Sequence, residues 1–358
     1  MATSYQVSVG DLLYTVVDDA TTTYWALLTG LVTDEIFGEL YAPDFSVVTG
    51  RDDLQLKKTA NGIYALTGYP DMSFPYHDSI SYNLNLQIKA SGFRGQSWVQ
   101  SVPAAQPFPI VIVTRALRRL PVRVQGRVVN NLTRAPIPGV QVISVDDPLT
   151  PPTVHVTAVR SPLYFDHPSG AQVQNVTMNA PVTLHLTADV TSGDQAINLS
   201  DRSGLAGNSV IQLRNVSQTL VEYAVVDHLG PGAPAAGQVF LRNALNRSYP
   251  QSSSVTFFTP VVAGGPATLS ADANAGDGVL LANQLLNGSA TLSVDSGSPA
   301  AEYHEVGAMT DADGYYGLDG MGRVREIFLH ATLGGLQQTV PWFIEYDHDV
   351  NVVDLRLS

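Results

Sequence analysis

The segment "VRVQGRVV", from Val122 to Val129, alternates apolar and polar side chains with a period of two residues. Such alternation is typical of a β-strand with one buried face. The same pattern recurs in "LNLQIKA" (84–90) and "VTLHLTADV" (182–190), and no segment of helical length keeps a 3.6-residue period. The 30 glycines and 22 prolines fall mostly between such segments, where turns break an antiparallel sheet. The sequence therefore predicts an all-β protein built from antiparallel sandwiches.

The composition excludes nucleic acid as a partner. Of the 358 residues, 44% are hydrophobic and only 14% are charged, so uncharged polar residues must complete the surface, as in β-rich structural proteins. A chain of this length accommodates two or three domains with cores of their own. With 19 Lys and Arg residues and a formal net charge of -13, the chain has few cations to neutralise phosphates. Its one basic cluster, "RALRRLPVR" (115–123), is short, and we interpret it as a solvated strand-and-linker face.

The absence of cysteine excludes disulfides, thiolate chemistry and zinc–thiolate sites. The first ten residues, "MATSYQVSVG", contain neither the basic nor the apolar segment of a signal peptide. No transmembrane run follows from the sequence, and we expect no direct membrane insertion. The sequence therefore predicts cytoplasmic synthesis, and it leaves open that the protein is released or attached as part of a particle.

An internal repeat links two distant stretches, since "KTANGIYALTG" (58–68) aligns without gaps with "TDADGYYGLDG" (310–320). The second copy resembles the start of a calcium loop, with acidic side chains at Asp311 and Asp313. The first copy has no acid at either position, and an EF-type loop also needs a glutamate where Gly322 stands. Both copies keep an Asn-Gly or Asp-Gly pair and then alternating Tyr and Leu, which is typical of a hairpin turn and its second strand. We interpret four residues as structural turns without a metal: Asn61, Gly62, Asp313 and Gly314.

The segment "GRVVNNLTRAPIPGVQV" (126–142) resembles the opening of a carboxypeptidase regulatory-like domain, which is a transthyretin-like (Ig-like) β-sandwich. The segment 310–320 resembles the central strand signature of the same family, and the first sandwich keeps that motif at 58–68. In the family the two motifs lie close together in one small domain, so their separation here implies that an inserted domain splits the second sandwich. The resemblance implies a fold without catalytic activity, because these modules are attachments in many unrelated proteins. The implied domains are 1–122, then 123–147 plus 297–358, and the insert 148–296.

The inserted segment has a repeat of its own. "PLYFDHPSGAQV" (162–173) aligns without gaps with "ALNRSYPQSSSV" (244–255), and the ring at His167 corresponds to the ring at Tyr249. Further along, each copy leads to a Glu-Tyr pair, at Glu222-Tyr223 and Glu302-Tyr303. These units resemble the short β-repeats of phage tail, baseplate and contractile injection system proteins. Simple β-repeats also occur in adhesins and other surface proteins.

No catalytic motif is found in the sequence, which lacks a nucleophile elbow, a phosphate-binding loop, a dinucleotide-binding glycine pattern and a zinc-binding H-E-x-x-H. "YDHDV" (346–350) places three candidate metal ligands side by side, but successive residues of a strand point to opposite faces, so we interpret it as a solvated turn. In "EYHEV" (302–306), Glu302 and His304 share a face but lack a third ligand, so we interpret them as polar residues of the core or edge. We expect no enzyme activity, no metal and no cofactor.

Rigid β-modules with few charges suit edge pairing and side-by-side packing in a symmetric array. The sequence therefore predicts a non-enzymatic structural or assembly component of a phage-tail-like or contractile injection particle, with protein partners and many copies. The N-terminal arm is the expected contact, because a free extended segment can add to a partner as a strand. The arm contains the contact residues Ser4, Tyr5, Gln6 and Val7.

Two alternatives stay open. A carbohydrate- or surface-binding β-sandwich module would use exposed aromatics, and the candidates are Trp25, Trp98 and Trp342, although each lies in or beside an apolar stretch that favours burial. A glycan hydrolase would need two facing carboxylates, and nothing marks such a pair among the 32 acidic residues.

Overall fold

In the computed structural model, every regular element of the described residues is a β-strand, which confirms the all-β prediction. None of the described residues forms a helix long and apolar enough to cross a membrane. The chain divides into two compact units, Met1–Leu120 and Pro121–Ser358. The described residues are 3–9, 12–18, 25–38, 45–59, 61–68, 81–104, 109–111, 114–149, 152–215, 220–263, 265–286, 291–295 and 301–358.

The first unit is built around two sheets that share one core. One sheet has the order β10-β3-β6-β5 with β9 also on β3, the other has the order β4-β7-β8, and β1 pairs with β2. In β7, Leu84, Leu86 and Ile88 are buried in this core, so the period of two in the sequence is the period of the buried face. The strands are β1 Thr3–Val9, β2 Leu12–Asp18, β3 Trp25–Asp34, β4 Ser46–Val48, β5 Gln55–Lys58, β6 Ile63–Gly68, β7 Tyr82–Lys89, β8 Gln96–Val102, β9 Ile110–Val111 and β10 Arg115–Leu117.

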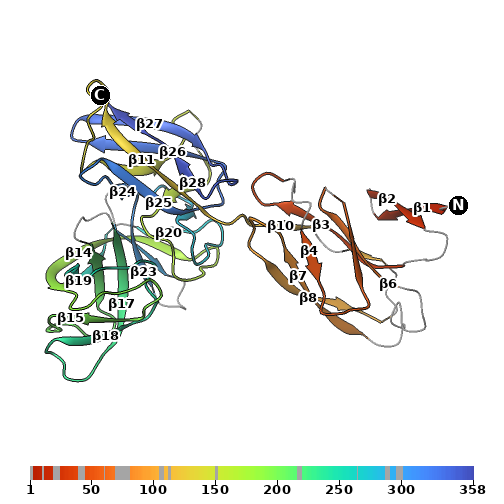
Figure 1. Cartoon of the computed structure of the whole chain (residues 1–358), viewed down its shortest axis with the longest axis horizontal. Coiled ribbons are helices and arrows are strands. Elements are labelled where there is room, and N and C mark those ends of the chain that lie inside the picture. Colours follow the sequence, from red (N-terminus) through yellow and green to blue (C-terminus); the bar gives the residue numbers. More distant parts are fainter. Residues whose placement is uncertain are drawn as a thin grey trace. The chain divides into compact units, whose positions relative to one another are not determined.

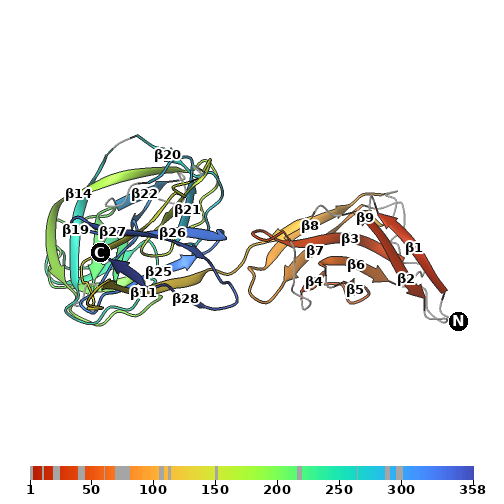
Figure 2. The same ribbon diagram turned by 90° about the horizontal axis from the view of Figure 1, so that it is seen from above.

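The second unit contains a sandwich made from the two ends of its chain. One sheet has the order β25-β11-β28, with β29 also on β11, and the other has the order β24-β12-β26-β27. Both sheets bury one face in the same core, which includes Val124, Val142, Leu318 and Leu329. Figures 1 and 2 show the yellow strand β11 beside the blue strands from the C-terminus. The strands are β11 Val122–Asn130, β12 Gln141–Val145, β24 Ala308–Met309, β25 Tyr315–Met321, β26 Glu326–Leu333, β27 Leu336–Phe343, β28 Val350–Val352 and β29 Leu355–Leu357.

The two segments that carry the family resemblance meet in this sandwich. Strand β11 runs antiparallel to β25, with Gly126 opposite Tyr316. The hydroxyl of Tyr316 donates a hydrogen bond of 2.6 Å to the carbonyl oxygen of Val353. A Cβ atom at Gly126 would overlap that carbonyl group, so the close approach of the Val353 backbone requires glycine at this position.

Between β12 and β24 the chain forms the inserted β-repeats. Their main sheet has the order β15-β18-β17-β16-β19-β14-β22-β23, with β20 also on β14, and β13 pairs with β21. The central strands β14 and β19 are antiparallel and lie side by side, in yellow-green and turquoise in Figure 1. The strands are β13 His155–Ala158, β14 Gln172–His185, β15 Ala196–Leu199, β16 Val210–Arg214, β17 Val221–Leu229, β18 Gly237–Leu241, β19 Ser254–Val262, β20 Ala267–Thr268, β21 Val279–Ala282, β22 Thr291–Asp295 and β23 Glu302–Glu305.

The sequence repeat gives this region an approximate two-fold symmetry. Strands β14 and β19 occupy corresponding repeat positions and pair with each other, and outward from them β22 corresponds to β16 and β23 to β17. The copies also exchange strands. Strand β13, which precedes the first repeat segment, pairs with β21 of the second copy, and β18, which precedes the second repeat segment, pairs with β15 of the first copy. Two cores result, which we call the inner half (184–255) and the outer half (159–173 with 267–306). The inner half is therefore inserted in the outer half, which is itself inserted in the sandwich.

Candidate functional site

The predicted turn residues lie in two turns of the same geometry. Gly62 and Gly314 have positive φ angles of 82° and 75°, which glycine adopts without strain. The N–H of Gly62 donates to the carbonyl of Thr59 at 3.3 Å, and the N–H of Gly314 donates to the carbonyl of Asp311 at 3.0 Å. These turns contain the four residues Asn61, Gly62, Asp313 and Gly314.

The strands around the two turns are paired differently. Strands β5 and β6 form a hairpin around the first turn. At the second turn, β24 pairs with β12 and β25 pairs with β11, so the chain passes from one sheet of the sandwich to the other. The prediction of a hairpin is therefore wrong for residues 310–320. The turn is fixed locally by its glycine, whereas the partner of each strand depends on which face of the core the strand covers.

Calcium is expected to leave the stability of the protein unchanged. The Oδ1 atom of Asp311 accepts the N–H groups of Asp313 and Tyr315, each at 2.9 Å, so this carboxylate is used inside its own turn. Within the described part of the chain, no group of three or more His, Cys, Asp or Glu residues is placed to hold a metal ion. The check is thermal unfolding in calcium and in a chelator. A rise of more than a few degrees with calcium would contradict the assignment of Asp311 to the turn.

The predicted partner contact lies in the N-terminal strand β1, which contains Ser4, Tyr5, Gln6 and Val7. Strand β1 pairs antiparallel with β2 along its whole length. The expectation of a free arm is therefore corrected, because β2 already occupies one edge of β1. Among the described strands none pairs with the other edge, and contact of that edge with a partner stays a prediction.

The other sequence candidates are not brought together. Residues 347–349 lie in a turn after β27, where the side chain of His348 is 68% exposed. Trp98 and Trp342 are partly buried against the cores of their own units, and Trp342 donates to the Oδ1 atom of Asn351 at 3.2 Å. The side chain of Trp25 lies outside the described residues.

The outer half contains a buried carboxylate that accepts four hydrogen bonds. Glu302 in β23 is 2% exposed. Its Oε1 atom lies 2.5 Å from Nε2 of His167 and accepts the N–H of Phe165 at 3.4 Å. Its Oε2 atom accepts the N–H of Tyr164 at 2.7 Å and lies 2.9 Å from Nε2 of His304. Glu302 and His304 are thus core residues as predicted from their spacing, and His167 is a partner that the local sequence did not show.

The inner half contains a second carboxylate in the corresponding place. Glu222 in β17 is fully buried, and its Oε2 atom accepts the hydroxyl of Tyr249 at 3.1 Å. Its Oε1 atom accepts the N–H of Asn246 at 2.6 Å. Asn246 corresponds to Tyr164 in the repeat, so each carboxylate holds the same turn by the same backbone group. The hydroxyl of Tyr164 also donates to Oε1 of Glu222, which links the two halves.

The two carboxyl groups have opposite pKa shifts. Burial raises the pKa of Glu222, and the hydrogen bonds that it accepts only partly offset this effect. Burial also acts to raise the pKa of Glu302, but hydrogen bonds from His167 and His304 outweigh it and lower the pKa to about 2. Burial, and then the neighbouring Glu222, raises the pKa of the Tyr249 hydroxyl far above its usual value.

Opposite shifts in two carboxyl groups are also the pattern of an acid–base pair. Here, however, the oxygens of Glu222 and Glu302 accept hydrogen bonds from the protein's own buried donors. The geometry is therefore that of two clamps that fix the repeat turns at residues 162–168 and 244–250. A clamp of this kind stiffens the junction between the halves, because a buried carboxylate that loses its donors is costly.

The end of β25 makes polar contacts with both halves of the repeats and with β11. Nη2 of Arg247 lies 2.5 Å from Oδ2 of Asp319, and Nη1 of Arg123 lies 3.3 Å from Oδ1 of the same residue. The N–H of Gly278 donates to the carbonyl of Gly320 at 2.6 Å. The contacts of Arg247 and Gly278 attach the sandwich to the inserted repeats within the second unit.

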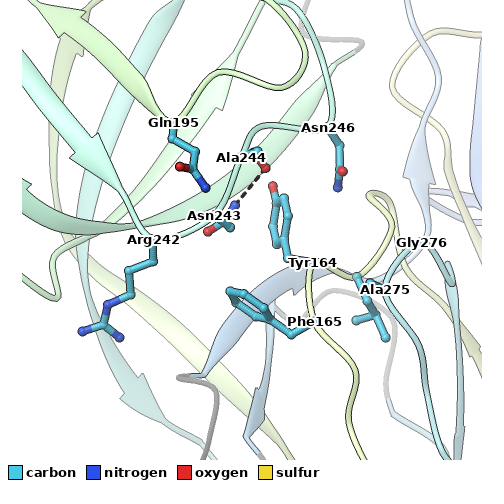
Figure 3. Close-up of a pocket in the computed structure, with 10 residues that line it drawn as sticks. Tyr164, Phe165, Gln195, Arg242, Asn243, Ala244, Asn246, Ala275 and Gly276 are labelled. Carbon is cyan, nitrogen blue, oxygen red and sulfur yellow. Dashed lines mark hydrogen bonds between the residues drawn. The ribbon is translucent and has the colours of Figure 1, made fainter.

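An open pocket of about 340 Å³ lies where the turns of the two halves meet. Figure 3 shows the rings of Tyr164 and Phe165 next to each other, with Gln195 and Arg242 on two other segments and the Arg242 guanidinium directed away from the Tyr164 ring. The amide of Asn243 donates to the carbonyl of Ala244 at 3.3 Å. The pocket is lined by Leu163, Tyr164, Phe165, Gln195, Arg242, Asn243, Ala244, Asn246, Ala275 and Gly276.

Comparison with known proteins identifies no family. No family model and no curated protein matches the chain. Two solved structures of BcpA, the major pilin subunit of Bacillus cereus, one of them a variant, align over 94% of this chain and 99% of theirs, with 8% and 7% identity and TM-scores of 0.22 and 0.20. The Bacillus anthracis TIE protein aligns over 97% of this chain and 70% of its own, with 7% identity and a TM-score of 0.13. Scores this low carry no argument about fold or function.

Proposed function

We propose that this protein is a non-enzymatic structural component of a large multi-copy assembly. The observation that carries the proposal is the edge strand β27, whose outer edge pairs with no described strand. Its sequence "LQQTVPWF" has no charged residue, and Leu336 and Phe343 are 37% and 59% exposed. Proteins usually protect such edges with charge, bulges, proline or a covering segment, and here Pro341 protects a single position. An edge of this length and composition is suited to pairing with another subunit.

The finer assignment, to a phage-tail-like or contractile injection particle, rests on two resemblances. The repeats at 162–173 and 244–255 resemble the β-repeats of such particles. The segments 126–142 and 310–320 resemble carboxypeptidase regulatory-like domains, and the pairing of β11 with β25 supports this because it brings both segments into one sandwich. The buried clamps at Glu222 and Glu302 suit a rigid subunit whose position in an array must be fixed.

Phe343→Lys is expected to remove the protein from its particle. The variant adds a charge to the outer part of β27, which opposes pairing with a neighbouring strand, while the exposed position leaves the core intact. Particles are purified from the native host, and subunit ratios are measured by mass spectrometry. We expect wild-type protein at a fixed ratio and the variant at roughly tenfold lower occupancy or less.

The matched control is Leu132→Lys, since Leu132 is 88% exposed in the turn after β11. Its occupancy should equal that of the wild type. Absence of wild-type protein from every particle fraction would overturn the assembly proposal. Full occupancy by Phe343→Lys would overturn the role of β27 alone.

The alternative of a carbohydrate-binding module requires aromatic faces that are free to stack on a sugar. The ring of Trp98 is covered by the guanidinium of Arg115, with Cζ 4.6 Å from the ring centroid. Trp342 is held by Asn351 and packs against the sandwich core. These observations favour structural roles for both rings.

A further inference from the structure

The two-fold symmetry of the repeats creates two corresponding sites, and the end of β25 fills one of them. In the filled site, Gly278 donates its N–H to Gly320, and a Cβ atom at Gly278 would overlap the carbonyl of Asp319. The side chain of Arg247 binds the carboxylate of Asp319 and also donates to the carbonyl of Arg160 at 3.0 Å. An acidic β-bulge, at Asp319 and Gly320 in β25, therefore covers this site.

The corresponding site contains Gln195 in place of Gly278 and Phe165 in place of Arg247. The backbone hydrogen bonds establish the correspondence, because Val159 donates to the carbonyl of Gly278 at 2.9 Å and Leu241 donates to the carbonyl of Gln195 at 2.8 Å. Gln195 and Phe165 both line the open pocket of Figure 3. The same surface that is covered in one half is thus a pocket in the other.

The pocket also contains Arg242, which corresponds to Arg160 but does not form the ion pair that Arg160 forms with Glu305. The N–H of Arg160 donates to the carbonyl of Glu305, and the N–H of Arg242 donates to the carbonyl of Val225, so Val225 stands where Glu305 stands in the other half. The side chain of Arg160 is 3% exposed, and its Nη1 atom lies 2.7 Å from Oε2 of Glu305. Arg242 is half-buried, and no ion pair joins it to any residue that the structure describes.

We propose that this pocket is a docking site for a short acidic segment of a partner protein, whose carboxylate pairs with Arg242. A guanidinium binds a carboxylate through two parallel hydrogen bonds, which gives direction as well as affinity. The exposed amide of Gln195 replaces the N–H of Gly278 as a donor to the partner's backbone. Because Gln195 has a side chain where Gly278 has none, the partner's backbone lies farther out than Gly320 does. The site would be one contact between this protein and its partners in the proposed assembly, and its function in a particle rests on that proposal.

The first test is binding of a cyclic peptide with the sequence of residues 314–323, GYYGLDGMGR, to the full-length chain, measured by titration calorimetry. This probe carries the acidic bulge of β25 that covers the filled site. Arg242→Gln is expected to weaken binding at least about tenfold, and so is Asp319→Asn in the peptide, because each removes one side of a charge-assisted pair. The control Arg356→Gln removes an exposed arginine on β29 and should leave binding unchanged. Equal unfolding midpoints must show that each variant is folded.

The proposal is overturned if the peptide does not bind at millimolar concentration, or if it binds wild type and Arg242→Gln equally. Binding of galacturonic acid in place of the peptide would identify an acidic-sugar site and would also overturn it. In purified particles, occupancy by Arg242→Gln should fall below that of the wild type. Full occupancy by this variant would overturn the docking site alone, whereas absence of the wild type would overturn the assembly role instead.

Discussion

A fragment of residues 297–358 is expected to be unfolded when it is produced alone. It contains β23 to β29 but lacks β11 and β12, which lie inside the two sheets of the sandwich. Without them β25, β28 and β29 lose the strand that joins them, and β24 loses its connection to β26. The core also loses Val122, Val124, Val128, Val140 and Val142. Narrow amide dispersion in the NMR spectrum is the expected observation.

Joining residues 123–147 to 297–358 through a short Gly-Ser linker is the matched control, and it is expected to restore a folded domain. Strands β12 and β24 are paired, with Val142 opposite Ala308, so the linker connects two segments whose strands are already neighbours in one sheet. The joined protein should be less stable than the intact chain, because the insert contributes Ala158 and Val279 to the same core. Dispersed amide signals from 297–358 alone would show that the split-sandwich interpretation is wrong.

Glu302→Ala is expected to destabilise the second unit by about 3–5 kcal/mol, the range for breaking a buried charged pair by removing one partner. The change leaves the rings of His167 and His304 and the N–H of Tyr164 without their buried acceptor. Denaturant unfolding followed by circular dichroism measures the loss. The control is Glu345→Ala, since the side chain of Glu345 is 63% exposed and its removal should change stability little. An unchanged unfolding midpoint for Glu302→Ala would refute the clamp.

The same variant should change the acid dependence of stability. The pKa of Glu302 is lowered from its ordinary value of 4.5 to about 2 in the folded protein, so its ionised form favours folding above pH 4.5, and this contribution is lost as the pH falls towards 2. The raised pKa of Glu222 acts in the opposite direction, since its contribution is present below its ordinary pKa and is lost as the pH rises through the folded value. Loss of stability between pH 4.5 and 2 should therefore be smaller in Glu302→Ala than in the wild type.

The candidate site could be predicted only in part from the sequence. The repeat alignment pairs His167 with Tyr249, and the Glu-Tyr pairs identify Glu222 and Glu302 as corresponding residues. Both copies keep a polar ring and a glutamate, which was a signal that the rings and the acids form one kind of site. Which ring meets which acid could not be predicted, because Glu302 bonds to His167 of the other repeat copy. A linear alignment does not show this exchange of strands between the copies.

The sequence by itself determined the local features of this protein. Alternation in Val122–Val129 places Val124 and Val128 on the buried face of β11, because side chains of a strand point alternately to its two sides. The glycines of the two aligned turns, Gly62 and Gly314, both adopt positive φ although the strands that follow them pair differently. These properties depend on neighbours within a few residues, so they can be derived without knowledge of the rest of the chain.

Only the tertiary structure decided which strands pair and which polar groups meet. Hydrogen bonds between strands are the same for any sequence, so the choice of partner depends on which apolar faces can be buried together, and that is a property of the whole chain. For this reason β25 joins β11 instead of forming a hairpin, Glu302 meets His167, and Asp319 covers one repeat site. The same choice leaves Arg242 in an open pocket, because Val225 occupies the place that Glu305 has beside Arg160.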